Sequence, residues 1–240
     1  MTSSSSTVDV PTHDGQRMPA QLARPSGGRG PGLVVLQEIF GITEYLLSRA
    51  QDLAQLGYVA LVPQLYWRLG LNLSTDETSQ AGLQEAFGLM QRLNQTQAVD
   101  DAVAALEYLR QLPDTGGRAG VLGFCMGGRM AYEVGVRSNP DVVVSYYGSG
   151  IADQLASAAQ LRAPIIFHFG AADAFLPVAD AERIRDAFAG RSDMEWHLHA
   201  DAGHAFDNRR APMFSYPPAA ADAWQQTVAF LQRHFPPNAT

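Results

Sequence analysis

The sequence predicts an α/β fold, in which a mostly parallel sheet carries helices on both faces. Two short apolar runs, GLVVLQ at 32–37 and PIIFHFG at 164–170, have the continuous hydrophobicity of strands that are covered on both sides. Segments with the spacing of amphipathic helices alternate with such runs along the chain, as in βαβ units. A chain of 240 residues can bury a large core within one domain. We therefore expect a single domain over residues 1–240.

The first element expected is a β-hairpin. STVDV at 6–10 and PAQLA at 19–23 flank a segment that contains Asp14-Gly15, a strong turn signal. The Ser-rich start at 1–6 and the last residues, 236–240, lack any periodic pattern. We expect both ends to be loose tails.

Strands and helices then alternate. A helix at 43–57 is indicated by Leu46, Ala50 and Leu53 on one face and by Gly57 as its stop signal. Two helices are expected within 67–112, packed over or beside the site, and the second has an apolar stripe of Val99, Val103, Leu106 and Leu109. Further strands are expected at 32–37, 58–63, 118–123, 142–147, 164–170 and 194–200. Later helices are expected at 126–136, 152–160, 178–189 and in a terminal segment that ends at Phe235. The sheet would have eight strands and be antiparallel only at its start.

Composition and charge restrict the functional classes. The net charge of −7 argues against nucleic acid or an anionic membrane as partner, because both select basic patches. No run approaches the roughly 18 apolar residues of a membrane span. The single cysteine excludes an intrachain disulfide, and the start of the chain lacks the pattern of a secretory signal. We expect a cytoplasmic protein, a monomer or weak homodimer, that acts on a small molecule.

Three candidate catalytic residues each follow a predicted strand. Cys125 lies in GFCMG, a frame with the shape of the G-x-S-x-G nucleophile elbow. Asp173 and His204 follow the strands at 164–170 and 194–200. Nucleophile, acid and histidine is the chain order of α/β-hydrolases, whose sites form at the carboxyl ends of the strands. His204 as an imidazolium would stabilise the Cys125 thiolate, and Asp173 would orient the imidazole ring.

Each of these residues also has a purely structural interpretation. Cys125 alone could be a small buried hydrophobe, Asp173 part of a plain turn, and His204 a helix cap or core histidine. The three motifs together, in this order and each after its own strand, favour a catalytic triad.

The chain resembles the dienelactone hydrolases (carboxymethylenebutenolidases) of the α/β-hydrolase superfamily from about Pro19 to Phe235. The resemblance rests on QEIFGI at 37–42, VPQLYWR at 62–68, GFCMGGR at 123–129, SYYG at 145–148, FHFGAADAFLP at 167–177 and AGHAF at 202–206. It implies an α/β-hydrolase fold and a Cys125, His204 and Asp173 triad that cleaves a lactone or ester, without a metal or an organic cofactor.

The resemblance also assigns a role to Glu38. The matching glutamate lies beside the resting thiol, where a carboxylate would disfavour the thiolate and, if moved by substrate, could take its proton. Alternatively, Glu38 only caps the loop before the helix. The backbone N–H groups of Ile39 and Met126 are the expected oxyanion donors.

The predicted substrate contacts depart from the family pattern. The family's dienelactone enzymes hold the substrate carboxylate with two arginines, one of them four residues after the histidine, where this chain has Asn208. Arg209 or Arg68 could replace that clamp, and a dienelactone-type substrate is then favoured. If neither does, a pocket edge of Tyr66, Trp67, Tyr147 and Phe206 would favour neutral or aryl esters.

Three rival functions remain open at this point. HLHADAGH places His197, His199, Asp201 and His204 close together, as a metallo-hydrolase would require, but this leaves the elbow and Asp173 without a purpose. The second rival is a catalytically silent binding protein on the hydrolase fold. The third is a redox-sensing thiol at Cys125.

Overall fold

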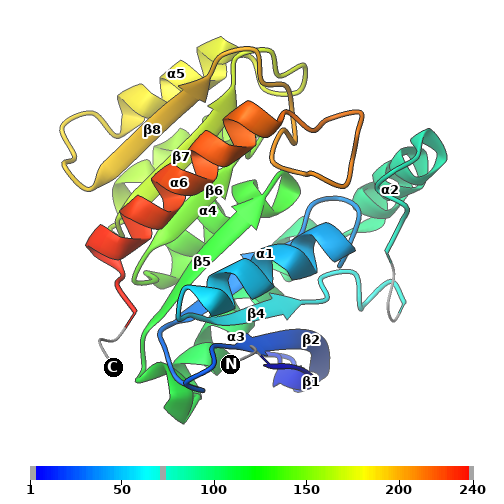
Figure 1. Cartoon of the computed structure of the whole chain (residues 1–240), viewed down its shortest axis with the longest axis vertical. Coiled ribbons are helices and arrows are strands. Elements are labelled where there is room, and N and C mark those ends of the chain that lie inside the picture. Colours follow the sequence, from blue (N-terminus) through cyan, green and yellow to red (C-terminus); the bar gives the residue numbers. More distant parts are fainter. Residues whose placement is uncertain (1–3, 71–73, 238–240) are drawn as a thin grey trace.

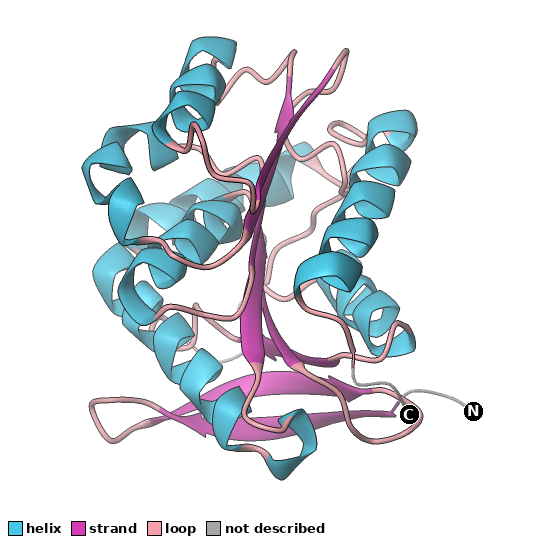
Figure 2. Cartoon of the chain, turned by 90° about the vertical axis from the view of Figure 1, so that its left-hand side faces the viewer, coloured by secondary structure: helices cyan, strands magenta, loops and turns pink. Residues whose placement is uncertain are grey.

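A computed structural model describes residues 4–70 and 74–237, and these residues form one eight-stranded sheet between two layers of helices (Figures 1 and 2). The strand order is β1-β2-β4-β3-β5-β6-β7-β8. β2 pairs antiparallel with β1 and β4, and every other neighbouring pair is parallel. The strands are β1 (Ser4–Pro11), β2 (Arg17–Arg24), β3 (Gly32–Leu36), β4 (Val59–Pro63), β5 (Ala119–Phe124), β6 (Val143–Tyr146), β7 (Ile165–Gly170) and β8 (Met194–His199). This confirms the predicted mostly parallel sheet.

Part of each predicted tail makes defined contacts within the described residues. The hairpin turns at Asp14-Gly15 as expected, but β1 starts at Ser4, which pairs with Arg24. The prediction of a loose tail is thus wrong for residues 4–6, because their backbone groups extend the ladder with β2. The carbonyl of Pro236 accepts a hydrogen bond from Arg118 at 3.1 Å. The remaining tail residues, 1–3 and 238–240, lie outside the described ranges.

The helices follow the predicted order. They are α1 (Glu44–Gln55), α2 (Gln80–Arg92), α3 (Gln95–Gln111), α4 (Met126–Ser138), α5 (Val178–Ala187) and α6 (Pro217–His234), with 3₁₀ turns at Pro113–Thr115 and Ile151–Gln160. Ile151–Gln160 is where a regular helix was predicted. Its Gln154 carbonyl accepts from the hydroxyls of Tyr132 and Ser157, which compete with the i→i+4 ladder. None of the helices in the described ranges is long and apolar enough to cross a membrane.

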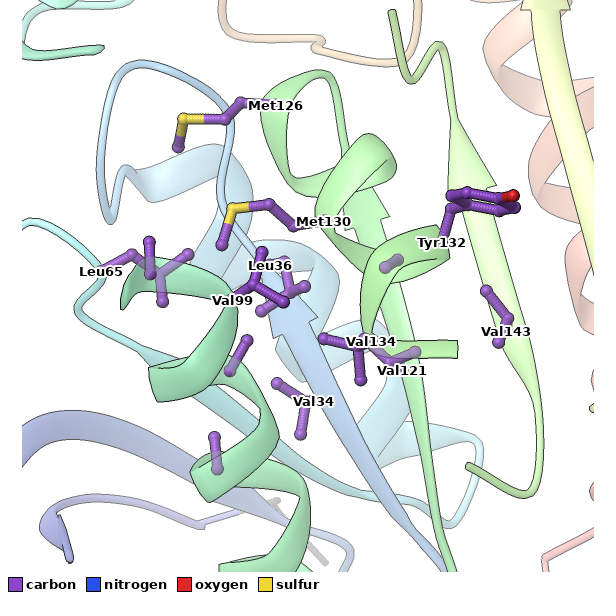
Figure 3. Packing of buried hydrophobic residues seen from close by; sticks show 14 of the residues in the cluster. Val34, Leu36, Leu65, Val99, Val121, Met126, Met130, Tyr132, Val134 and Val143 are labelled. Carbon is purple, nitrogen blue, oxygen red and sulfur yellow. The ribbon is translucent and has the colours of Figure 1, made fainter. Parts of the chain in front are cut away.

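The two faces of the sheet bury separate hydrophobic cores (Figure 2). α3, α4 and α5 cover one face, where Met130 of α4 and Val99 of α3 pack near Leu36 of β3 (Figure 3). α1 and α6 cover the other face. α2 contributes Leu83, Ala86 and Leu89 to the first core and projects beyond the sheet (Figure 1). A sheet fixed on both sides holds its strand ends at constant positions, which suits it to position a site.

The turn from β5 into α4 is tightly packed backbone. β5 ends at Phe124 and α4 begins at Met126, so Cys125 alone makes the turn, with a left-handed φ of 55°. A Cβ atom on Gly123 would lie 1.9 Å from the carbonyl oxygen of Gly127, and one on Gly127 would lie 2.4 Å from that of Leu36. Glycine is required at both positions because backbone, not a flexible side chain, occupies the space.

We predict that Gly123→Ala lowers the free energy of unfolding by about 1–3 kcal/mol or more, since the added methyl group must displace α4. Denaturant unfolding followed by circular dichroism measures the effect. Gly88→Ala, at an exposed position on helix α2, is the matched control, because no atom outside its own helix turn lies within 4 Å of its new Cβ, and it is expected to stabilise slightly. Equal stability of Gly123→Ala and the wild type would contradict the packing described for the turn.

Candidate active site

The three predicted catalytic side chains meet at the carboxyl ends of β5, β7 and β8. His204 Nε2 lies 3.0 Å from Cys125 Sγ, and His204 Nδ1 lies 2.8 Å from Asp173 Oδ2. The other oxygen of Asp173 accepts the backbone N–H groups of Phe175 at 2.7 Å and Leu176 at 3.0 Å. Asp173 is thus fixed by its own loop and can hold the imidazole ring in one orientation.

His204 and Cys125 form a coupled acid–base pair. Burial by itself lowers the pKa of His204, but the charge of a Cys125 thiolate and the hydrogen bond to Asp173 outweigh burial and raise the pKa to about 10. The histidine therefore holds two protons at neutral pH, and its imidazolium is a partner that stabilises a thiolate. Cys125 also lies at the N-terminus of α4, where the helix dipole favours negative charge.

Glu38 lines the same cavity as Cys125 and is 3% exposed. Its carboxyl accepts the Tyr147 hydroxyl at 3.2 Å and the Asn208 amide at 2.7 Å. The same Asn208 nitrogen donates to Glu77 at 3.1 Å, so that one amide joins two buried carboxyl groups. Burial raises the pKa of Glu38 to about 8, although the hydrogen bond from Asn208 works in the opposite direction. Glu38 is therefore mostly protonated, and uncharged, at neutral pH.

This raised pKa predicts a pH-dependent stability. Folded Glu38 keeps its proton up to pH 8 or so, whereas an unfolded glutamate loses it near the ordinary value of 4.5. The contribution of this proton to the free energy of unfolding is complete below pH 4.5 and is lost between pH 4.5 and about 8. Over this range, the free energy of unfolding falls by up to about 1.4 kcal/mol per pH unit. Glu38→Gln has no proton to lose, so its free energy of unfolding should fall less over this range.

Denaturant midpoints at several pH values measure the difference between wild type and Glu38→Gln. Glu85→Gln, on the exposed side of α2, is the control and should follow the wild type. If wild type and Glu38→Gln lose stability in parallel between pH 5 and 8, Glu38 does not carry the proton.

The two expected oxyanion donors come from two different segments, the loop after β3 and the start of α4. Ile39 lines the cavity from the loop after β3, and Met126 is the first residue of α4. Within the described part of the chain, neither backbone N–H donates to another protein group. The N–H of Gly127 donates to the Gln37 carbonyl at 3.0 Å and so joins the elbow to this loop.

The cavity beside Cys125 has a volume of about 130 Å³, and most of its wall is apolar. Its lining residues are Glu38, Ile39, Phe40, Leu83, Phe87, Met90, Cys125, Ser149, Phe175, His204, Ala205 and Phe214. Sequence reasoning missed most of this wall. The spacing of Leu83, Phe87 and Met90 on one face of α2 was an available signal, whereas nothing local marks Phe214.

The five residues predicted to bind substrate do not line this cavity. Tyr66 is buried and donates to the Ile39 carbonyl at 2.8 Å. The indole N–H of Trp67 donates to Asp101 at 2.8 Å. The rings of Tyr147 and Phe206 pack edge to face, with their centroids 5.2 Å apart, and the Tyr147 hydroxyl donates to Glu38. The fifth residue, Arg209, pairs with Asp52 at 2.7 Å, on the surface. In the structure, these five side chains therefore contact other protein groups and do not form the cavity wall.

The histidines of HLHADAGH separate into different surroundings. His204 faces Cys125, whereas His199 Nε2 lies 3.2 Å from His168 Nδ1, and His197 lies beside Glu195. Burial lowers the pKa of His168 well below its ordinary value and also lowers the pKa of His199. Across residues 4–70 and 74–237, no three His, Cys, Asp or Glu side chains are grouped as metal ligands.

Comparison with known proteins agrees with this geometry. The model of the dienelactone hydrolase family matches residues 18–235. A carboxymethylenebutenolidase from Pseudomonas sp. (strain P51) is 33% identical over 229 residues, which cover 95% of both chains. Another, from Pseudomonas putida, is 30% identical over 199 residues, covering 83% of this chain and 84% of its own.

Solved structures that are similar to this chain also include dienelactone hydrolases. A Klebsiella pneumoniae protein assigned as a dienelactone hydrolase superposes with a TM-score of 0.83 at 28% identity, over 97% of this chain and 100% of its own. A dienelactone hydrolase from Anabaena variabilis has the same fold, with a TM-score of 0.72 over 98% of this chain and 99% of its own, at 18% identity. The match of a family model over most of the chain, together with these relatives, shows that the chain is a hydrolase of the dienelactone hydrolase family, with the α/β-hydrolase fold.

Proposed function

We propose that the protein hydrolyses a lactone or carboxylic ester by covalent catalysis through Cys125. The observation that carries this proposal is the relay from Cys125 Sγ to His204 at 3.0 Å and from His204 to Asp173 at 2.8 Å. It opens on a cavity of about 130 Å³ that could hold the acyl group or the alcohol group. The relatives named carboxymethylenebutenolidases support an ester of the lactone type.

The proposed reaction has two halves. The Cys125 thiolate attacks the carbonyl carbon, and the electron pair moves to the carbonyl oxygen, beside the N–H groups of Ile39 and Met126. When the tetrahedral intermediate collapses, the C–O bond breaks and His204 gives its proton to the leaving oxygen. Water then attacks the thioester while His204 takes a proton from it. The C–S bond breaks, which restores the thiolate and the imidazolium.

In this mechanism, Glu38 acts by remaining uncharged. A protonated carboxyl group does not repel the neighbouring thiolate, whereas an ionised carboxylate would disfavour it. Because burial raises the pKa of Glu38 to about 8, it is in the neutral form at neutral pH. We propose that Glu38 keeps the thiolate available by staying protonated, with Tyr147 and Asn208 holding it in place.

The test is a screen of purified protein against lactones, aryl esters and carboxylate-bearing esters, with Cys125→Ala as the blank. Quenched samples taken during turnover of a slow ester should contain an acyl group on the peptide that carries Cys125, as found by mass spectrometry. Turnover that persists in the blank would refute the proposal. Loss of turnover with a metal chelator would favour the metallo-hydrolase alternative. If no ester is hydrolysed and peroxide oxidises the Cys125 thiol reversibly, the redox-sensor alternative would be favoured.

A further inference from the structure

Among the described residues, the wall of the active-site cavity has no arginine, and its one cation, the His204 imidazolium, already pairs with Cys125. The chain has no lysine, so all 17 of its Lys and Arg positions are arginines. None of them is among the residues that line the cavity beside Cys125. The ionisable groups of the lining are Glu38, Cys125 and His204, and the proposed mechanism already uses all three.

The arginines that could have served as a clamp are engaged elsewhere. Arg68 pairs with Asp101 at 2.8 Å and with Asp14 at 2.7 Å. Arg209 pairs with Asp52, and Arg210 pairs with Glu44. Moving Arg68 into the cavity would leave the 2% exposed Asp101 without its ion pair, which is a costly rearrangement.

Next to Glu38, the protein has one further acid group, Glu77, in place of a cation. Asn208 stands where the family pattern has a carboxylate-binding arginine, and its amide spans Glu38 and Glu77. A substrate carboxylate that entered here would lose its hydration beside the buried Glu38 carboxyl group, and the one cation of the described lining, the His204 imidazolium, is already paired with Cys125. Such a group disfavours binding, because an unpaired buried charge is expensive.

The mouth of the cavity is aromatic. Phe175 is 51% exposed, and its ring centroid lies 6.3 Å from that of Phe87 and 5.1 Å from that of His204. Phe87 also lines the cavity, next to Leu83 and Met90 of α2. A dry apolar cavity of about 150 Å³ holds a benzene ring, so the volume here suits a group of that size.

We infer that this site selects neutral esters or lactones whose aromatic or other apolar group packs against Phe87 and Phe175, and that it discriminates against carboxylate-bearing substrates. The inference rests on the proposed hydrolytic function and specifies its substrate class. It differs from the dienelactone-type preference expected from the sequence, which required Arg209 or Arg68 at the cavity.

The test compares two esters of matched shape, 4-(methoxycarbonyl)phenyl acetate and 4-carboxyphenyl acetate, after correction of each rate for its hydroxide-catalysed hydrolysis. We expect kcat/KM to be at least tenfold higher for the neutral ester. Phe175→Ala should lower kcat/KM for the neutral ester by about 3- to 10-fold through the lost aromatic contact. Leu47→Ala, a partly exposed position on α1 outside this cavity, is the control and should match the wild type.

A positive charge introduced at the mouth of the cavity provides a second test. Phe175→Arg replaces a half-exposed ring, so the fold should tolerate it, and the ratio of the two kcat/KM values should move toward the carboxylate ester by tenfold or more. Equal values in wild type, or a preference for the carboxylate ester, would overturn the inference while leaving Cys125-dependent hydrolysis intact. Arg92→Ala and Arg129→Ala would then identify the cation responsible. Absence of Cys125-dependent turnover of either ester would instead overturn the proposed function together with the inference.

Discussion

Replacing Cys125 with alanine is expected to lower kcat/KM for ester hydrolysis by at least about 10⁴-fold. The substitution removes the atom that forms the covalent bond to the acyl group, and no other described nucleophile lies against His204 Nε2. The remaining rate would come from the oxyanion donors and the cavity alone. Because Cys125 is only partly buried, the alanine variant should fold with a stability within about 1 kcal/mol of the wild type.

The same variant has a readout that does not depend on turnover. The thiolate is the largest of the influences that raise the pKa of His204, so Cys125→Ala should lower this pKa from its wild-type value of about 10. NMR titration of the histidine ring measures it. Cys125→Ser should also be a poor enzyme, because a hydroxyl ionises far less readily than a thiol. An alanine variant with near-normal activity and an unchanged His204 pKa would be incompatible with the proposed role of Cys125.

The second large effect is expected from Asp173→Asn, at about 10⁴-fold in kcat. Asp173 Oδ1 already accepts two backbone N–H groups, from Phe175 and Leu176, so the amide oxygen of asparagine would take this position. Its NH₂ group would then face His204 Nδ1 and force that nitrogen to accept. The neutral ring would carry its proton on Nε2 and could not take one from water in the second half of the reaction.

The control for this variant is Asp180→Asn, an exposed acid that pairs with Arg183 and should not alter kcat. Stability should change little in either variant, since asparagine keeps the acceptor for the loop. A loss of less than tenfold in Asp173→Asn would mean that another group orients the imidazole.

The sequence was sufficient to predict the sheet and the grouping of Cys125, Asp173 and His204, for one physical reason. In a parallel sheet, the residue after each strand lies at the same edge, so Cys125, Asp173 and His204 could be placed together from the strand pattern alone. The start of β1 at Ser4 was missed, because a polar strand at the sheet edge has no hydrophobic pattern.

The cavity wall could not be predicted in the same way. Phe87 comes from a helix that projects beyond the sheet, and Phe214 from a loop after β8, and only tertiary packing brings them together. The ion pairs of the arginines could not be predicted from sequence either. That Arg68 is held by Asp101, 33 positions away in sequence, depends on how α3 packs beside the loop after β4. Sequence motifs predicted the residues that follow strand ends along one edge of the sheet, whereas the proposed selectivity depends on contacts between distant segments.

The hydrogen bond from Gly127 to the Gln37 carbonyl has a consequence for the rate of reaction. It joins the first turn of α4 to the loop after β3, and these are the two segments that carry the proposed oxyanion donors, Met126 and Ile39. Their separation is therefore set before any substrate arrives. In water, solvent dipoles must reorient around a developing oxyanion, and that reorganisation forms a large part of the barrier. Here the dipoles are oriented by the folding of the chain, and the cost of their arrangement is met once, at folding, instead of in every turnover.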